Sequence, residues 1–357
     1  MAQTIVIYVG MLFLSIVIAT VAARKKDKRY FYLVVLLLAL VAGLRGPTVG
    51  TDTSHYIYFM NLMSQGRVDE IYSLEAPFIL FCQILLSVWN NPHFVLFIIA
   101  LITHGCILLR LWDFRKLIDL PCAVGIYYCL YYFLSLNICR QLCCVAIVFY
   151  ATRYLLKKDY IGFVLRALPA VVFHKSAVLL VLFFFLEVLM WRYLGEKQRR
   201  LLKVLLKISP FAIVAALIVF WRSLHYFLDF QIDIGLMLPI KLIFFLWSKN
   251  QIDVDSLLHK IHKPAQQKYV CRMIEAVEIY YVVGIFMTML GYFYPYMERM
   301  GLLFYIFEIV YMALFLRRGK NKVVALLSIV LLFGYDFMVG LITNSNGQNP
   351  YLFIWQG

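Results

Sequence analysis

The sequence of 357 residues is poor in charge, since Asp, Glu, Lys and Arg make up only 15% of it. Soluble domains carry about a quarter charged residues. Hydrophobic residues make up 64%, and the mean hydropathy is +0.83. The apolar runs do not alternate with polar positions, which excludes a membrane β-barrel. The composition therefore predicts an all-α polytopic membrane protein.

Motifs for metals and nucleotides are missing as well. The sequence has no Cys-x-x-Cys pair, no His-x-x-x-His pair and no glycine-rich phosphate loop with its lysine. The eight cysteines lie mostly within apolar runs and are interpreted as small core residues. The net charge of +15 is assigned to cytoplasmic loops, because a basic folded domain is lacking. We expect no metal, no cofactor and no nucleic-acid partner.

What the sequence does contain is a series of thirteen hydrophobic segments. The first is expected to be a retained helix rather than a signal peptide, because it lacks a basic leader. Linkers and repeats are absent, so a single integral membrane domain over 1–357 is expected. The segments are 2–23, 30–44, 72–89, 93–111, 120–136, 138–156, 160–173, 176–194, 208–224, 234–248, 270–292, 300–316 and 322–342.

Lysine and arginine in the short loops predict the orientation. Arg45, in a loop over 45–71, faces outward if the basic stretches face the cytoplasm. Two segments separate it from the inward-facing Arg115, so one of them does not span. Glu75 and Pro77 interrupt the start of 72–89, which is therefore the expected re-entrant segment. About twelve spans with both termini outside remain. The cytoplasmic stretches are 24–29, 115–116, 157–158, 192–200, 317–322 and the amphipathic loop 249–268.

Five polar clusters then fall on the outward side. Their convergence on one face predicts an outward-facing site. The clusters are "LRGPTVGTDTSHY" from Leu44, "NICRQ" (137–141), "FHKSA" (173–177), "PYMERM" (295–300) and "NPYLF" (349–353).

The arginines of these clusters have two interpretations each. Arg140, flanked by Asn137 and Gln141, suits a phosphate or pyrophosphate through its planar guanidinium, or forms a structural ion pair in the bundle. Arg45 binds phosphate or anchors among lipid headgroups. Arg299 either binds an anion or forms a rim ion pair with Glu298.

The other polar residues also leave alternatives open. Asp52 caps the next helix or acts as a general base. His174 is a satisfied core residue or a proton acceptor. Tyr351 belongs to an interfacial aromatic belt or stacks on sugar rings.

The order and spacing of these motifs resemble the EpsG family, which belongs with the Wzy-type polymerases of exopolysaccharide, capsule and O-antigen. The resemblance covers about residues 44–352 and rests on "VGTDTSHY", "LEAPF", "NICRQ", "FHKSA", the late "ER" and the terminal "PY". It implies a fold similar to the C-type (GT-C) membrane glycosyltransferases.

The resemblance further implies an enzyme that joins oligosaccharide repeat units on the outer face of the bacterial cytoplasmic membrane. Donor and acceptor are both linked to undecaprenyl pyrophosphate, membrane lipid surrounds them, and a flippase and a chain-length regulator are possible partners. His174 is the first candidate base and Asp52 the second, while Arg140 assists catalysis by stabilising the leaving pyrophosphate. The residues expected to bind pyrophosphate or sugar are Arg45, Arg140, Gln141, Asn137, Arg299, Tyr56 and Tyr351.

Two other classes of function remain as alternatives, a transporter and an acyltransferase. A lipid-linked oligosaccharide flippase would spread charged residues through to the cytoplasmic side. A membrane acyltransferase would use an intramembrane histidine, but would leave the outward arginines unexplained.

Overall fold

The computed structural model describes residues 2–202, 204–205, 208, 237–259, 261–291 and 294–356. Within these ranges every regular element is a helix, and the β-contacts are two isolated bridges, Arg45 with Phe353 and Ile252 with Gly319. The predicted all-α architecture is confirmed. Apart from residue 208, the predicted segment 208–224 lies outside the described residues.

Five helices in the described part of the chain are long and apolar enough to cross a membrane. A pair bent by 42° makes a sixth if it counts as one span. The protein is thus built as a membrane protein, whereas twelve spans are not confirmed. The five are Gln3–Lys25 in α1 (Ala2–Lys25), α5 (Pro92–Asp113), Leu120–Asn137, α15 (Pro264–Leu290) and Lys322–Thr343; the bent pair is α16 (Pro295–Tyr305) with α17 (Phe307–Arg318).

Two of the five spans contain a π-helical turn. The first comprises α6 (Leu120–Tyr127), the turn Tyr128–Tyr132 and α7 (Phe133–Asn137). The second comprises α18 (Lys322–Ile329), the turn Val330–Gly334 and α19 (Tyr335–Thr343).

Other predicted spans form helices shorter than the roughly 20 residues that a crossing needs. Pro169 separates α9 from α10, because proline lacks the N–H that a continuous helix requires. The shorter helices are α2 (Lys28–Gly43), α8 (Cys139–Leu155), α9 (Tyr160–Ala167), α10 (Ala170–Phe173), α11 (Leu180–Val188) with the π turn Leu189–Tyr193, and α13 (Met237–Lys249).

Helix α4 (Ala76–Val88) is the element formed by the segment that was predicted to be re-entrant. Its 13 residues extend about 20 Å, against about 30 Å of hydrocarbon. The length agrees with a segment that does not cross. The predicted amphipathic loop 249–268 contains a five-residue helix, α14 (Asp255–His259), and ends within α15.

The chain forms two compact units where the sequence indicated one domain. Unit 1 comprises Met1–Arg153, Ile161–Val178 and Lys322–Gly357, and unit 2 comprises Tyr154–Tyr160 and Leu179–Asn321. The sequence gives no sign of this division, because the chain passes from one unit to the other within apolar segments and short basic loops rather than through a flexible linker.

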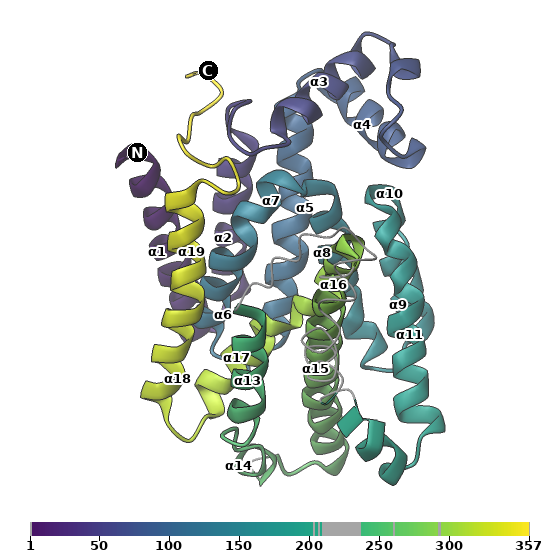
Figure 1. Cartoon of the computed structure of the whole chain (residues 1–357), viewed down its shortest axis with the longest axis vertical. Coiled ribbons are helices and arrows are strands. Elements are labelled where there is room, and N and C mark those ends of the chain that lie inside the picture. The colour runs from purple at the N-terminus through teal and green to yellow at the C-terminus, as the bar shows by residue number, and fades with distance from the viewer. Residues whose placement is uncertain are drawn as a thin grey trace, which may run out of the picture. The chain divides into compact units, whose positions relative to one another are not determined.

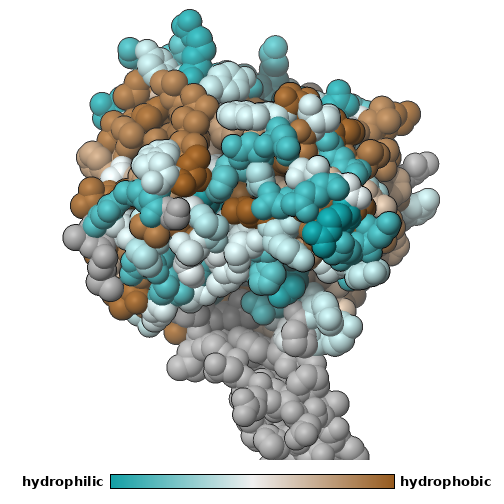
Figure 2. Space-filling model, turned by 90° about the horizontal axis from the view of Figure 1, so that it is seen from above, coloured by the Kyte–Doolittle hydropathy of each residue, from teal (hydrophilic) through white to brown (hydrophobic). Residues whose placement is uncertain are grey.

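In unit 1, helix α2 packs against α1 and α5, and α6 packs against α1 and α5. Gly43 allows α2 and α5 to approach closely, since a Cβ there would lie 2.6 Å from the Phe97 Cβ. Helices α3 (Thr53–Ser64) and α4 lie at the same end of these helices as the two chain termini (Figure 1). Hydrophilic side chains gather on this end, with hydrophobic residues toward its edge (Figure 2).

Unit 2 is organised around α15, which packs against α13, α16 and α17. Gly284 brings α15 against α16, because a Cβ there would lie 2.5 Å from the backbone nitrogen of Tyr305. Two charge pairs are buried among the described residues of this unit. Lys241 Nζ lies 3.6 Å from Glu308 Oε1, and Arg272 forms an ion pair with Glu187.

Candidate functional site

Arg45 directly follows α2 and is 1% exposed. Its Nε donates to Thr53 Oγ1 at 3.0 Å, one Nη donates to the Leu136 carbonyl at 3.1 Å, and the other donates to the Ala42 carbonyl. Burial lowers the pKa of Arg45, but arginine stays protonated in proteins. The guanidinium therefore connects the loop that follows α2 to the ends of α2 and α7. Its predicted contact with pyrophosphate stays a prediction.

Asn137, at the end of α7, holds the next part of the same loop. Its Oδ1 accepts from the Thr51 backbone N–H at 2.8 Å, and its Nδ2 donates to the Asn346 carbonyl at 3.1 Å. Gly50 has a φ of +92°, and a Cβ there would lie 2.9 Å from Asn137 Oδ1. The loop therefore requires glycine at this position on two independent grounds.

The C-terminal segment pairs with this loop along its backbone. The Gly46 N–H donates to the Leu352 carbonyl at 2.7 Å, and the Ile354 N–H donates to the Leu44 carbonyl at 3.0 Å. The Gly50 N–H donates to a carbonyl of the same segment at 2.8 Å. Two polar clusters from opposite ends of the sequence thus form one structure. Its outward orientation stays a prediction.

Asp52 occupies the N-cap position of α3, but the hydrogen bond expected from its capping interpretation is not formed. Its side chain accepts no capping hydrogen bond from the helix, and Oδ1 accepts from Thr51 Oγ1 at 3.1 Å instead. The carboxylate is partly exposed. It is therefore accessible to solvent, and a general base must be within reach of the proton that it accepts.

Arg140 lies in the first turn of α8 and is 8% exposed. It forms an ion pair with Glu75, the N-cap residue of α4, whose side chain is 32% exposed. Its Nε donates to the Phe173 carbonyl at 3.3 Å, and its guanidinium lies 4.7 Å from the centre of the Phe78 ring. Three predicted motifs, "LEAPF", "NICRQ" and "FHKSA", therefore meet at one buried arginine.

His174 follows α10 directly. Its Nδ1 accepts from the Ser176 backbone N–H at 3.1 Å and lies 2.8 Å from Ser176 Oγ. Because Nδ1 accepts, the neutral ring carries its proton on Nε2. Ser176 Oγ also lies 3.7 Å from Cys144 Sγ on α8. This arrangement favours a hydrogen-bond donor over a base, and the predicted role of His174 as proton acceptor stays a prediction.

Tyr56, on α3, is close enough to both Asp52 and Arg140 to feel their charges. Burial is the main cause that raises its pKa well above the ordinary value, and the neighbouring Cys139 thiol adds to the rise. Arg140 acts in the opposite direction and Asp52 in the same direction as burial. The phenol is therefore a neutral group within the electrostatic range of both. Gln141, beside Arg140, is 4% exposed.

The remaining predicted residues lie elsewhere. Tyr351 is buried, its hydroxyl donates to the Val41 carbonyl at 2.7 Å, and its ring meets Tyr8 edge to face at 5.5 Å. It therefore packs the C-terminal segment onto the helices. Arg299 is exposed on α16 and belongs to unit 2, whereas the other eight predicted site residues belong to unit 1.

Residues 28–353 match the EpsG family, a range that contains all nine predicted site residues. The chain belongs to the EpsG family. No curated protein and no solved structure gives a significant match to it. Membership confirms the resemblance noted from the motifs and indicates a membrane protein of exopolysaccharide biosynthesis, of the polymerase type.

Two residues of this EpsG-family site were not predicted. Glu75 was interpreted only as an interruption of an apolar segment. Glu75 directly precedes an apolar segment in a chain with several arginines in polar clusters. This position could have predicted that it pairs with Arg140. Asn346 gave no such signal, because its contact with Asn137 joins positions 209 residues apart.

Metal ligands are not gathered in the described parts of this EpsG-family chain. No group of three or more His, Cys, Asp or Glu side chains there is arranged to hold an ion. The cations of the site are arginines.

Proposed function

We propose that this protein is a polymerase that joins oligosaccharide repeat units linked to undecaprenyl pyrophosphate, with its site facing out of the cytoplasmic membrane. The observation that carries the proposal is the Glu75–Arg140 pair. In this pair a buried guanidinium meets a carboxylate whose side chain is 32% exposed, and residues of three motif segments gather around it. Membership of the EpsG family supports the same reaction class.

Arg140 is assigned to the pyrophosphate of the donor. Its guanidinium is already oriented by the Phe173 carbonyl and the Phe78 ring, so little conformational freedom is lost when an anion binds. The Glu75 carboxylate occupies the place where the Arg140 guanidinium would bind an anion. A pyrophosphate carries more charge than a carboxylate and can replace Glu75 there through a bidentate contact.

Asp52 is assigned the proton of the acceptor hydroxyl. Its carboxylate is partly exposed and is not used to cap α3. His174 is assigned the opposite role, donation from Nε2 to an oxygen of the substrate, because Ser176 occupies its Nδ1.

The reaction exchanges one carbon–oxygen bond for another and moves one proton. The acceptor hydroxyl oxygen attacks the anomeric carbon of the donor, and its proton passes to Asp52. The bond from that carbon to the pyrophosphate oxygen breaks, and the electron pair leaves with the lipid pyrophosphate. Arg140 stabilises the charge that develops there. The step consumes no oxidant, reductant or nucleotide, and no cofactor is assigned.

Arg45, Asn137 and Tyr351 are assigned as positioning residues in this scheme. Their side chains connect the outward loop, α7 and the C-terminal segment. Tyr56 and Gln141 are assigned to sugar or phosphate oxygens beside Arg140. Arg299 of unit 2 keeps its proposed contact with pyrophosphate, on the evidence of its motif alone.

The test is the length of the surface glycan in cells that carry Arg140→Lys, with the amount of protein in the membrane measured in parallel. Lysine keeps the charge but loses the bidentate fork. The matched control is Arg153→Lys on the same helix, whose guanidinium binds Asp113 and the Tyr150 hydroxyl. We expect Arg140→Lys to abolish long polymer and leave single repeat units, and the control to leave normal polymer.

Other phenotypes would reject the proposal. If the gene is deleted and no repeat units reach the outer surface, the protein is a flippase. If deletion leaves full-length polymer without acyl groups, it is an acyltransferase. Normal polymer in Arg140→Lys cells would show that Arg140 does not bind the pyrophosphate.

A further inference from the structure

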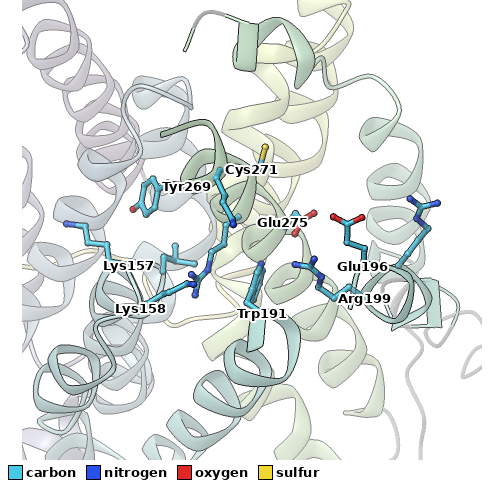
Figure 3. A pocket seen from close by; sticks show the side chains of 12 residues that line it. Lys157, Lys158, Trp191, Glu196, Arg199, Tyr269, Cys271 and Glu275 are labelled. Carbon is cyan, nitrogen blue, oxygen red and sulfur yellow. The ribbon is translucent and has the colours of Figure 1, made fainter. Parts of the chain in front are cut away.

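Unit 2 contains a cavity of about 800 Å³ that is separate from the cluster around Arg140. Segments far apart in the sequence line it: residues 156–158, the stretch from Trp191 to Arg200, and the N-terminal part of α15. The labelled side chains of Lys157 and Lys158 lie on one side of Trp191 and those of Glu196 and Arg199 on the other (Figure 3). Six cationic side chains line it: Lys157, Lys158, Arg199, Arg200, Lys268 and Arg272.

The cavity has too few acidic groups to balance these cations. Two carboxylates, Glu196 and Glu275, line it as well. Arg272 is neutralised by its buried ion pair with Glu187 and lies 5.2 Å from the Trp191 ring centre. The other five cations have no ion-pair partner within 4 Å among the described residues. Like charges held around one cavity repel each other, and an anion would relieve that repulsion.

The ends of α15 locate this cavity relative to the outward-facing residues of unit 2. Its lining residues begin at Lys268, near the start of the helix. At the other end of α15, Gly291 touches Glu298, the neighbour of Arg299, with a built Cβ 2.7 Å from the Glu298 Cβ. About twenty helical residues between these ends span about 30 Å, the thickness of the hydrocarbon core. If Arg299 faces outward, the cavity faces the cytoplasm, as its lysines and arginines also predict.

The general excess of lysine and arginine in cytoplasmic loops explains why these loops are basic. It does not explain why their cationic side chains line one cavity. Lysines that merely face the cytoplasm would spread over the surface, whereas these line one concavity together with the aromatic residues Trp191 and Tyr269. A volume of this size matches sites for organic ligands, which are about 300–1,000 Å³. Lysine and arginine together are the usual partners of phosphate.

We propose that this cavity binds an organic phosphate with two or more negative charges on the cytoplasmic side. The phosphates contact the lysines and Arg199 and Arg200, and the organic part packs on Trp191. The headgroup of an anionic phospholipid and a free organic phosphate share this chemistry. The inference does not depend on the reaction proposed for the outward site.

The test uses the full chain in nanodiscs of phosphatidylcholine. One probe is inorganic pyrophosphate, measured by titration calorimetry, and the other is cardiolipin in the disc, counted by native mass spectrometry. The double variant Arg199→Gln with Lys268→Gln removes two cations from the cavity. The matched control, Lys197→Gln with Lys263→Gln, removes two exposed cations from the same segments that do not line it.

We expect the cavity variant to bind one or both probes at least about tenfold more weakly than the control. Because every variant keeps Arg140, binding at the outward site is common to all of them. Weaker cardiolipin retention alone identifies a lipid headgroup, and weaker pyrophosphate binding alone identifies a soluble phosphate. A charge-retaining pair, Arg199→Lys with Lys268→Arg, should keep the binding and so excludes simple unfolding. Equal binding by cavity and control variants would overturn the proposal.

Discussion

The ion pair between Glu75 and Arg140 gives the sharpest prediction about the candidate site. Glu75→Gln keeps the shape of the side chain and removes its charge. Arg140, 8% exposed, would then retain the Phe173 carbonyl and the Phe78 ring but no counter-charge. The start of α4 should open more often, because Glu75 is its N-cap residue.

The burial of the two side chains sets the size of the effect. Unit charges about 4 Å apart interact by about 4 kcal/mol at an effective dielectric constant of about 20. Water reaches Glu75, whose side chain is 32% exposed, and weakens the interaction. Exposed pairs contribute about 0.5 kcal/mol and breaking a buried pair costs about 3–5 kcal/mol. We therefore expect a coupling of about 2 kcal/mol between Glu75 and Arg140.

A double-mutant cycle of Glu75→Gln and Arg140→Gln measures this coupling through hydrogen exchange of the α4 amides. Local opening is the suitable quantity, because a chain of two units need not unfold in one step. About 2 kcal/mol corresponds to roughly a 30-fold change in exchange rate. The exposed pair Arg67–Glu70, with side chains 54% and 47% exposed, serves as the control and should couple by less than about 0.5 kcal/mol. A similarly small value for Glu75 and Arg140 would refute the reasoning.

Three further predictions concern the packing around the site and in unit 2. Gly50→Ala should destabilise the outward loop by about 1–2 kcal/mol in a protease-accessibility assay, whereas Gly66→Ala, also at positive φ but in open space, should leave that loop intact. Gly284→Ala should lower the thermal midpoint by separating α15 from α16, at a cost of about 1–3 kcal/mol, while Gly10→Ala, with open space around it, should not. Arg45→Lys should reduce the amount of folded protein in the membrane, because one ammonium cannot serve all three acceptors, at a cost of about 1–3 kcal/mol.

The helical class of the fold was predictable because hydrophobic segment length carries most of the information. The number of crossings was not, because apolar composition does not fix where a helix stops. The segment 160–173 reads as one run, yet its helix is interrupted at Pro169. The segment 72–89 could be distinguished from a membrane span only by the sides predicted for Arg45 and Arg115. Its short helix agrees with that argument.

Much of the candidate site was visible in the sequence as residue types that do not belong in a bilayer. Arg140, Asn137 and Asp52 were identified in this way, and the structure brings their motifs together. Their partners were less predictable. The acceptors of Arg45 are mostly backbone carbonyls, which every residue has, so no side-chain pattern marks them.

The pairing of the outward loop with the C-terminal segment has a consequence for biosynthesis. Val41 and Tyr351 are in contact although 310 positions separate them. During translation the loop after α2 leaves the ribosome long before the strand-like segment that completes its hydrogen bonds. Until then, Gly46 and Gly50 lack the carbonyls that their N–H groups find in the finished protein. The cluster formed by this loop and the C-terminal segment is therefore completed last, and a nascent chain stalled before residue 346 would lack these hydrogen bonds.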